Sequence, residues 1–167
     1  MIAPKTYQVA ELRHLRAALN YRGTSASGQA CVLWSAALAL DLRAVLTFGT
    51  LRAAEVHEFV GVPGRAEVPF IHAWVEAGAF VYAPTTNRRT AGLLMPMARD
   101  HYYEVNGVTD ARSLPPRELQ TIARRWRFAS ALKHLSPRAG DRAFPEELMR
   151  AAGVRWHTGP SREILPG

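Results

Sequence analysis

The segment from Ser27 to Leu40 contains the single cysteine of the chain and constrains the fold more than any other stretch. Small and polar residues give way at Cys31 to a run of good helix formers. When this run is drawn at 3.6 residues per turn, several apolar side chains fall on roughly the same side as Trp34. Ser27 or Gly28 can start such a helix. The segment therefore predicts a buried helix with Cys31 in or near its first turn.

A thiol in the first turn of a helix lies near the positive end of the helix dipole and near amides that lack an intrahelical partner. Both features favour the thiolate over the thiol, and the same amides can bind a developing oxyanion. Cys31 is therefore a candidate nucleophile. Packing is the alternative, and this segment alone favours it, because free cysteines are among the most buried residues in proteins.

A second segment places a histidine about forty residues after the cysteine. Between Phe70 and Glu76 every second residue is aliphatic, and this period of two predicts a β-strand. Gly78 predicts a hairpin turn, followed by a returning strand over 80–82. A cysteine at a helix start and a histidine in a strand are the arrangement expected of a nucleophile and its general base. The alternative for His72 is a hydrogen-bonded histidine on a half-buried strand.

Three features together resemble the transglutaminase-like branch of the papain-type cysteine enzymes. They are Gly-Gln-x-Cys at 28–31 before an apolar helix, a short strand near 43–49, and His-Ala-Trp-Val-Glu at 72–76. The resemblance covers about residues 25–86 and is closest to compact bacterial members, including the leader-peptide proteases of lasso-peptide biosynthesis. It implies that Cys31 is the nucleophile and that His72 is the general base.

The sequence departs from this family where an acidic residue should orient the histidine. In the family the strand after the histidine usually ends in aspartate, often followed by Pro-Thr, whereas this chain has Ala83 before Pro-Thr. Asn87 is our first choice for the orienting group, because an amide can hold an imidazole in one tautomer.

Three acidic residues are alternatives to that amide. Asp100 and Glu104 qualify if the strand that we predict for them lies beside the strand of His72. Glu76 shares a face with His72 but is a poor choice, because about 6–7 Å separate positions two residues apart on a strand.

The resemblance implies acyl transfer through a thioester between Cys31 and the carbonyl carbon of a substrate. With water as acceptor the outcome is hydrolysis of a peptide or amide, and with an amine it is cross-linking or amide exchange. Hydrolysis is our first choice, because water needs no second binding site. Gln29 and Trp74, together with backbone amides near Cys31, are expected to bind the substrate or its oxyanion.

A non-enzymatic binding module is the second hypothesis. Such a module keeps the scaffold, has lost the orienting acid at Ala83, and uses Cys31 for packing. Its partner would bind the basic cluster of Arg124, Arg125 and Arg127 on a C-terminal helix.

The charge and composition indicate which partners to expect. The formal net charge of +7 comes almost wholly from arginine and attracts acidic peptides or proteins. Nucleic acid is a further class of anion, but the chain has no zinc-finger spacing, RNP-like motif or clear helix-turn-helix pattern. The apolar runs are too short to span a membrane, and one cysteine fits a reducing cytoplasm. No cofactor is expected, and Glu55, His57 and Glu58 lack a metal-ligand spacing.

The length of 167 residues suits one domain over 1–167, with a helical C-terminal portion from about 114. We predict an α+β fold with a transglutaminase/papain-like core, in which the Cys-bearing helix packs on a small antiparallel sheet and further helices lie at both ends. The expected helices cover 8–20, 114–135 and 144–151. Strands are expected over 43–51 and 99–105, with a loop over 84–97 that borders the site.

Overall fold

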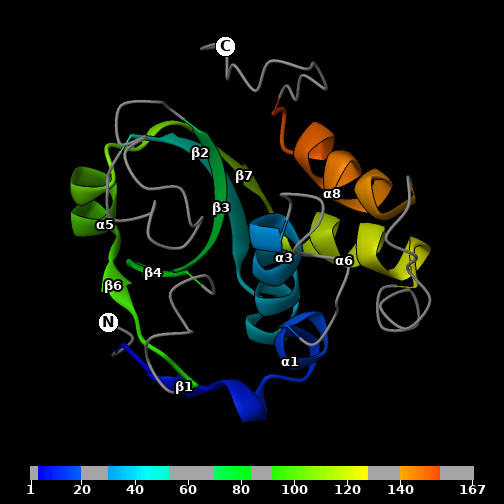
Figure 1. The fold of residues 1–167 in the computed structure, drawn as a ribbon, viewed down its shortest axis with the longest axis horizontal. Coiled ribbons are helices and arrows are strands. Elements are labelled where there is room, and N and C mark those ends of the chain that lie inside the picture. Colours follow the sequence, from blue (N-terminus) through cyan, green and yellow to red (C-terminus); the bar gives the residue numbers. More distant parts are fainter. Residues whose placement is uncertain (1–3, 20–29, 53–69, 84–91, 128–139, 155–167) are drawn as a thin grey trace.

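The computed structural model describes residues 4–19, 30–52, 70–83, 92–127 and 140–154. Helices and antiparallel strands are mixed along these residues, so the predicted α+β class is confirmed. Figure 1 shows a central sheet between two layers of helices. One layer holds α5 (Arg99–Val105), and the other holds α1 (Arg13–Leu19), α3 (Ala30–Leu42), α6 (Pro116–Arg125) and α8 (Gly140–Ala151).

The central sheet has five strands in the order β6-β4-β3-β2-β7, and all neighbours are antiparallel. Its members are β2 (Val45–Leu51), β3 (Phe70–Ala77), β4 (Phe80–Tyr82), β6 (Met97–Ala98) and β7 (Thr109–Leu114). A separate two-stranded sheet pairs β1 (Tyr7–Gln8) with β5 (Leu93–Leu94).

The hairpin that carries the histidine follows the prediction. Strands β3 and β4 are joined by a tight turn in which Gly78 has a φ of +63°, a conformation that glycine adopts without strain. Strand β3 pairs with β2 along its whole length, whereas its described pairs with β4 extend only from Ala77 to Val75. In the part of the chain that the structure describes, the residues of β3 before Val75 therefore do not pair with β4.

Helix α3 is the centre of the larger helical layer. Its sequence is rich in alanine and leucine, and apolar side chains cover nearly every face, as expected of a helix that is buried from several directions. It packs against α1, α6 and β3. The main core includes its buried residues, Ala73 and Val75 from one face of β3, and apolar residues of the surrounding helices and strands. None of the described helices is long and apolar enough to cross a membrane.

The N-terminal helix begins later than the predicted range of 8–20. Strand β1 and a short 3-10 helix, η1 (Val9–Glu11), come before α1. The carboxylate of Asp41, near the end of α3, accepts hydrogen bonds from the backbone N–H groups of His14 and Leu15 at 3.0 and 2.9 Å. These amides lie in the first turn of α1 and have no intrahelical partner. A side chain from α3 thus fixes where α1 starts.

The strand predicted over 99–105 is wrong, because these residues form helix α5. The buried residues Tyr102 and Asn106 are four positions apart, which is a helical spacing that the loose alternation of the sequence conceals. Strand β7 was not predicted. It is exposed up to Leu114 and mostly polar, so it lacks the apolar alternation by which a strand is recognised.

The C-terminal helices differ from the prediction in their limits. Leu114 ends β7, so the helix expected over 114–135 begins instead at Pro116, and residues 128–139 lie outside the described residues. Helix α8 begins at Gly140 and contains the helix predicted over 144–151. In the described part of the loop predicted over 84–97 lie β5 and the start of β6.

Gly49 of β2 lies opposite His72 and allows the ring of Trp74 to approach the sheet. A Cβ atom at position 49 would lie 2.5 Å from Cη2 of Trp74 and 3.3 Å from a methyl group of Val108. We predict that Gly49→Ala lowers the free energy of unfolding by about 1–3 kcal/mol, because the buried ring must shift. Urea unfolding measures this loss.

The same substitution should cost less in a Trp74→Leu background, because the clash depends on the indole ring. An equal cost in both backgrounds would show that Trp74 does not lie over Gly49.

Candidate functional site

The thiol of Cys31 lies at the edge of β3. Cys31 and Ser35 are four residues apart on α3, so their side chains share one face of the helix. The backbone N–H of Ala73 hydrogen-bonds to the thiol. The hydroxyl of Ser35 donates to the carbonyl oxygen of Ala73 at 2.9 Å. Two side chains of α3 thus bind both polar backbone groups of one β3 residue.

The position of Ala73 explains this arrangement. Residues two apart on a strand present their backbone groups to the same side, so Ala73 and Val75 both face the side on which β4 lies. Val75 pairs with Tyr82, the last residue of β4. At Ala73, beyond the last described pair with β4, side chains of α3 bind the backbone of β3. The prediction that Cys31 lies in the first turn of the described helix and packs on the sheet is confirmed.

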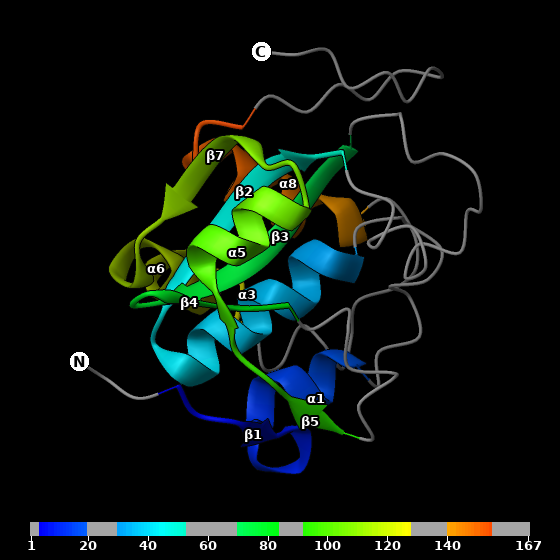
Figure 2. The ribbon, with the colours of Figure 1, turned by 90° about the vertical axis from the view of Figure 1, so that its left-hand side faces the viewer.

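His72 directly precedes Ala73 and is buried, with 3 % of its surface exposed. By the alternation of the strand it shares a face with Trp74, and α5 covers this face (Figure 2). The thiol of Cys31 therefore lies beside the backbone of the residue next to His72. The structure brings together the two segments that carry the predicted nucleophile and the predicted base.

Burial keeps both groups neutral at pH 7. It raises the pKa of the Cys31 thiol to about 11, although the hydrogen bond from the Ala73 amide acts in the opposite direction. It lowers the pKa of His72 to about 4. The resting state is thus a thiol and an uncharged imidazole.

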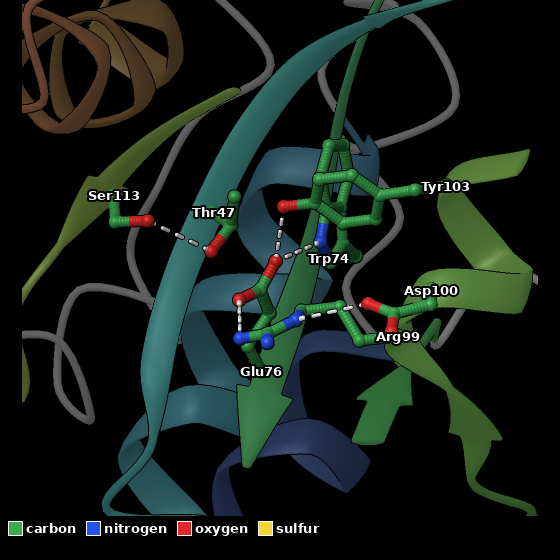
Figure 3. A network of polar contacts seen from close by, with 7 residues as sticks. All are labelled: Thr47, Trp74, Glu76, Arg99, Asp100, Tyr103 and Ser113. Atoms are coloured by element: carbon green, nitrogen blue, oxygen red, sulfur yellow. Dashed lines mark hydrogen bonds and ion pairs between the residues drawn. The ribbon is translucent and has the colours of Figure 1, made fainter. Parts of the chain in front are cut away.

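A carboxylate on the same strand holds α5 against the sheet (Figure 3). Glu76 accepts hydrogen bonds from Nε1 of Trp74 at 3.0 Å and from the hydroxyl of Tyr103 at 2.5 Å. Arg99, the first residue of α5, lies 3.9 Å from its other oxygen. On the same face Thr47 and Ser113 link β2 to β7 through their hydroxyls at 3.2 Å. Glu76 is therefore engaged in joining β3 to α5.

Trp74, expected to bind the substrate or its oxyanion, is fully buried and gives its indole N–H to Glu76. Gln29 and Asn87, the other two predicted site residues, lie outside the described residues. Asp100 and Glu104 are both exposed on α5, which is a helix and not the strand that their role required. Ala83 is buried in the apolar cluster of Trp74, on the face of His72.

Tyr102 is a residue of this region that was not among the predicted site residues. It projects from α5 onto Trp74, with ring centroids 5.4 Å apart, and is 5 % exposed. Its hydroxyl has no hydrogen-bond partner among the described residues. Burial raises the pKa of Tyr102, and the negative charge of an ionised Cys31 raises it further. The hydroxyl on the α5 face would therefore respond to a negative charge on Cys31.

No cluster of three or more potential metal ligands occurs among the described residues. No protein-family model, curated protein or solved structure matches the chain. The chemistry of the Cys31 region is therefore the basis on which a function is assigned.

The lowered pKa of His72 predicts a loss of stability in acid. The unfolded chain binds a proton at this histidine near pH 6.5, whereas the folded chain binds it only near pH 4. Between these values the unfolded state holds more protons, so the free energy of unfolding falls as the pH drops. The difference between the two pKa values corresponds to roughly 3 kcal/mol.

Urea unfolding at pH 7 and at pH 4, for the wild type and for His72→Gln, isolates this contribution. The wild type should lose more stability than the variant over this interval. Parallel losses in the two proteins would contradict a histidine that is buried in its neutral form.

Proposed function

We propose that the chain is a cysteine-dependent acyl-transfer enzyme that hydrolyses a peptide or amide bond through a thioester on Cys31. The observation that supports this most is the hydrogen bond between the Cys31 thiol and the Ala73 amide, directly beside His72 in β3. It joins a nucleophile in the first turn of a helix to the strand that carries a base. A cysteine with an adjacent histidine is a recurrent arrangement for covalent catalysis.

The reaction begins from the neutral pair. As the sulfur of Cys31 forms a bond to the substrate carbonyl carbon, the thiol proton passes to His72, and the carbonyl π electrons move to oxygen. The oxyanion then reforms the C=O bond and expels the amine, which leaves with the proton from His72. Water attacks the thioester with His72 again as the base. The carboxylic acid is released, and the thiol of Cys31 regains its proton.

We further propose that the fold is a transglutaminase-like variant of the papain-type core. Support comes from the packing of the Cys-bearing helix on an antiparallel sheet and from the order of helix α3, strand β2 and the His-bearing β3 along the chain. Asn87 remains the proposed orienting residue, since Ala83 brings no polar side chain to the face of His72. The expected substrates are peptides or proteins, with acidic ones favoured by the net charge of +7.

An inactive binding module is the second candidate, and the uncharged resting state of both reactive groups favours it. A thiol with a pKa of about 11 is a poor nucleophile at rest. The binding surface would be the exposed Arg124 and Arg125 of α6, although Arg125 already forms an ion pair with Glu147 of α8. In this case Cys31 reacts only after unfolding.

Acylation by p-nitrophenyl acetate at neutral pH tests the proposed activity. The wild type should release p-nitrophenolate in a burst and gain one acetyl group, which peptide mapping places on Cys31. His72→Ala should slow the burst by roughly 100- to 10,000-fold, as expected when a general base is removed. His101→Ala is the matched control, because this histidine is exposed on α5, and its burst should equal that of the wild type.

Two results would refute the acyl-transfer proposal. One is a folded wild type that is not acetylated until urea is added, which is the result expected of the binding module. The other is a burst of equal rate in the wild type and in His72→Ala.

A further inference from the structure

The hydroxyl of Tyr102 is buried and has no hydrogen-bond partner among the residues that the structure describes. Leaving a buried hydroxyl without a partner costs about 1–3 kcal/mol, and such groups are rare in folded proteins. Its neighbour Tyr103 donates to Glu76, so the same helix satisfies one tyrosine and leaves the next unsatisfied in the described structure. A phenylalanine would fill the same apolar space against Trp74 at no such cost.

The hydroxyl of Tyr102 belongs to the environment of the thiol. The ring packs on Trp74, which follows Ala73, and the Ala73 amide binds the thiol. The charge of an ionised Cys31 also acts on the phenol. Since β4 does not extend along this part of β3 in the described pairs, groups from the two faces of the sheet can meet at its edge. Cys31 of α3 and Tyr102 of α5 thus lie against the same stretch of β3 from its two faces.

We propose that the hydroxyl of Tyr102 donates a hydrogen bond to the carbonyl oxygen of the acyl group that Cys31 attacks. This inference rests on the proposed acyl transfer and adds the group that stabilises the oxyanion. A substrate carbonyl entering beside the thiol supplies the acceptor that the hydroxyl lacks. As the carbon–sulfur bond forms, the oxygen gains negative charge, and the hydrogen bond strengthens because it lies in a water-excluded site.

Tyr102 and Tyr103, two neighbouring residues of α5, provide matched variants for the test. Tyr102→Phe removes the unpartnered hydroxyl, whereas Tyr103→Phe removes a hydroxyl that is bound to Glu76. For each variant we would measure the p-nitrophenyl acetate burst and the rate of alkylation by iodoacetamide. Alkylation substitutes at a saturated carbon and creates no oxyanion, so it reports the access and ionisation of Cys31 alone.

We expect Tyr102→Phe to slow acylation by roughly 100-fold, the effect of removing one oxyanion donor. Its alkylation rate should stay within about twofold of the wild type, because replacing one unpartnered hydroxyl leaves the packing intact. Tyr103→Phe should change the two rates by the same factor, because its hydroxyl anchors α5 and touches no substrate.

The possible failures are distinguishable. Acylation of Tyr102→Phe at the wild-type rate, with His72→Ala still impaired, would overturn the role of Tyr102 and leave the acyl transfer standing. Equal losses of acylation and alkylation would show that Tyr102 is structural. Absence of acylation in the folded wild type would refute both the acyl transfer by Cys31 and the role of Tyr102. Should Tyr102→Phe fail to fold, 3-fluorotyrosine at position 102 keeps the hydroxyl and makes it a stronger donor, so it should accelerate acylation and leave alkylation unchanged.

Discussion

The docking of helix α3 on the edge of β3 is the contact on which the rest of the site depends. An unpaired strand edge exposes N–H and C=O groups that must find partners when they are buried. At Ala73 the thiol of Cys31 and the hydroxyl of Ser35 provide those partners, beyond the last β4 pair that the structure describes. The sulfur of Cys31, in the first turn of α3, thus lies at the edge of β3 and beside the residue that follows the buried His72.

The opposite face of the sheet completes this region. Glu76 binds Trp74, Tyr103 and Arg99, and so holds α5 over β3. Tyr102 of α5 is thereby held against Trp74. Because Gly49 has no side chain, the indole can lie close to β2 and keep this layer compact. The contacts that stabilise the fold on this face therefore also position the hydroxyl to which we assign a role in acyl transfer.

The neutral resting state of the pair sets the chemistry that the site can perform. An ion pair of thiolate and imidazolium would require solvation or charged partners to offset the cost of burying two charges. Burial instead leaves the proton on the thiol and the imidazole uncharged. A thiol in this state reacts when a bound carbonyl accepts the sulfur while the histidine takes the proton. We therefore expect the reactivity of Cys31 to depend strongly on the substrate that occupies the site.

Local patterns in the sequence predicted three central elements, and the structure confirms them. The helix of Cys31 has a run of good helix formers, strand β2 is rich in Val, Leu and Phe, and the strand of His72 alternates with a period of two. Helix α5 and strand β7 were missed for a physical reason. α5 spans fewer than two full turns, too short for its periodicity to show, and β7 is an exposed strand that owes its place to pairing with β2.

The site itself could be predicted only in part. Cys31 and His72 stand out by residue type and spacing, but the contact at Ala73 involves backbone groups, and no side chain at position 73 signals it. Tyr102 could not be recognised, because a tyrosine that packs and a tyrosine with an unsatisfied hydroxyl look the same in a sequence. Only the tertiary structure shows that α5 brings this hydroxyl to the far side of β3.

Hydrogen exchange at the Ala73 amide, followed by NMR in the wild type and in Cys31→Ala, tests the central contact most directly. The Val75 amide serves as an internal reference, because Val75 pairs with Tyr82 whatever residue occupies position 31. We predict that loss of the thiol speeds exchange at Ala73 by roughly fivefold relative to Val75, as for a hydrogen bond worth about 1 kcal/mol. An unchanged ratio would contradict a thiol held at the edge of β3 beside His72.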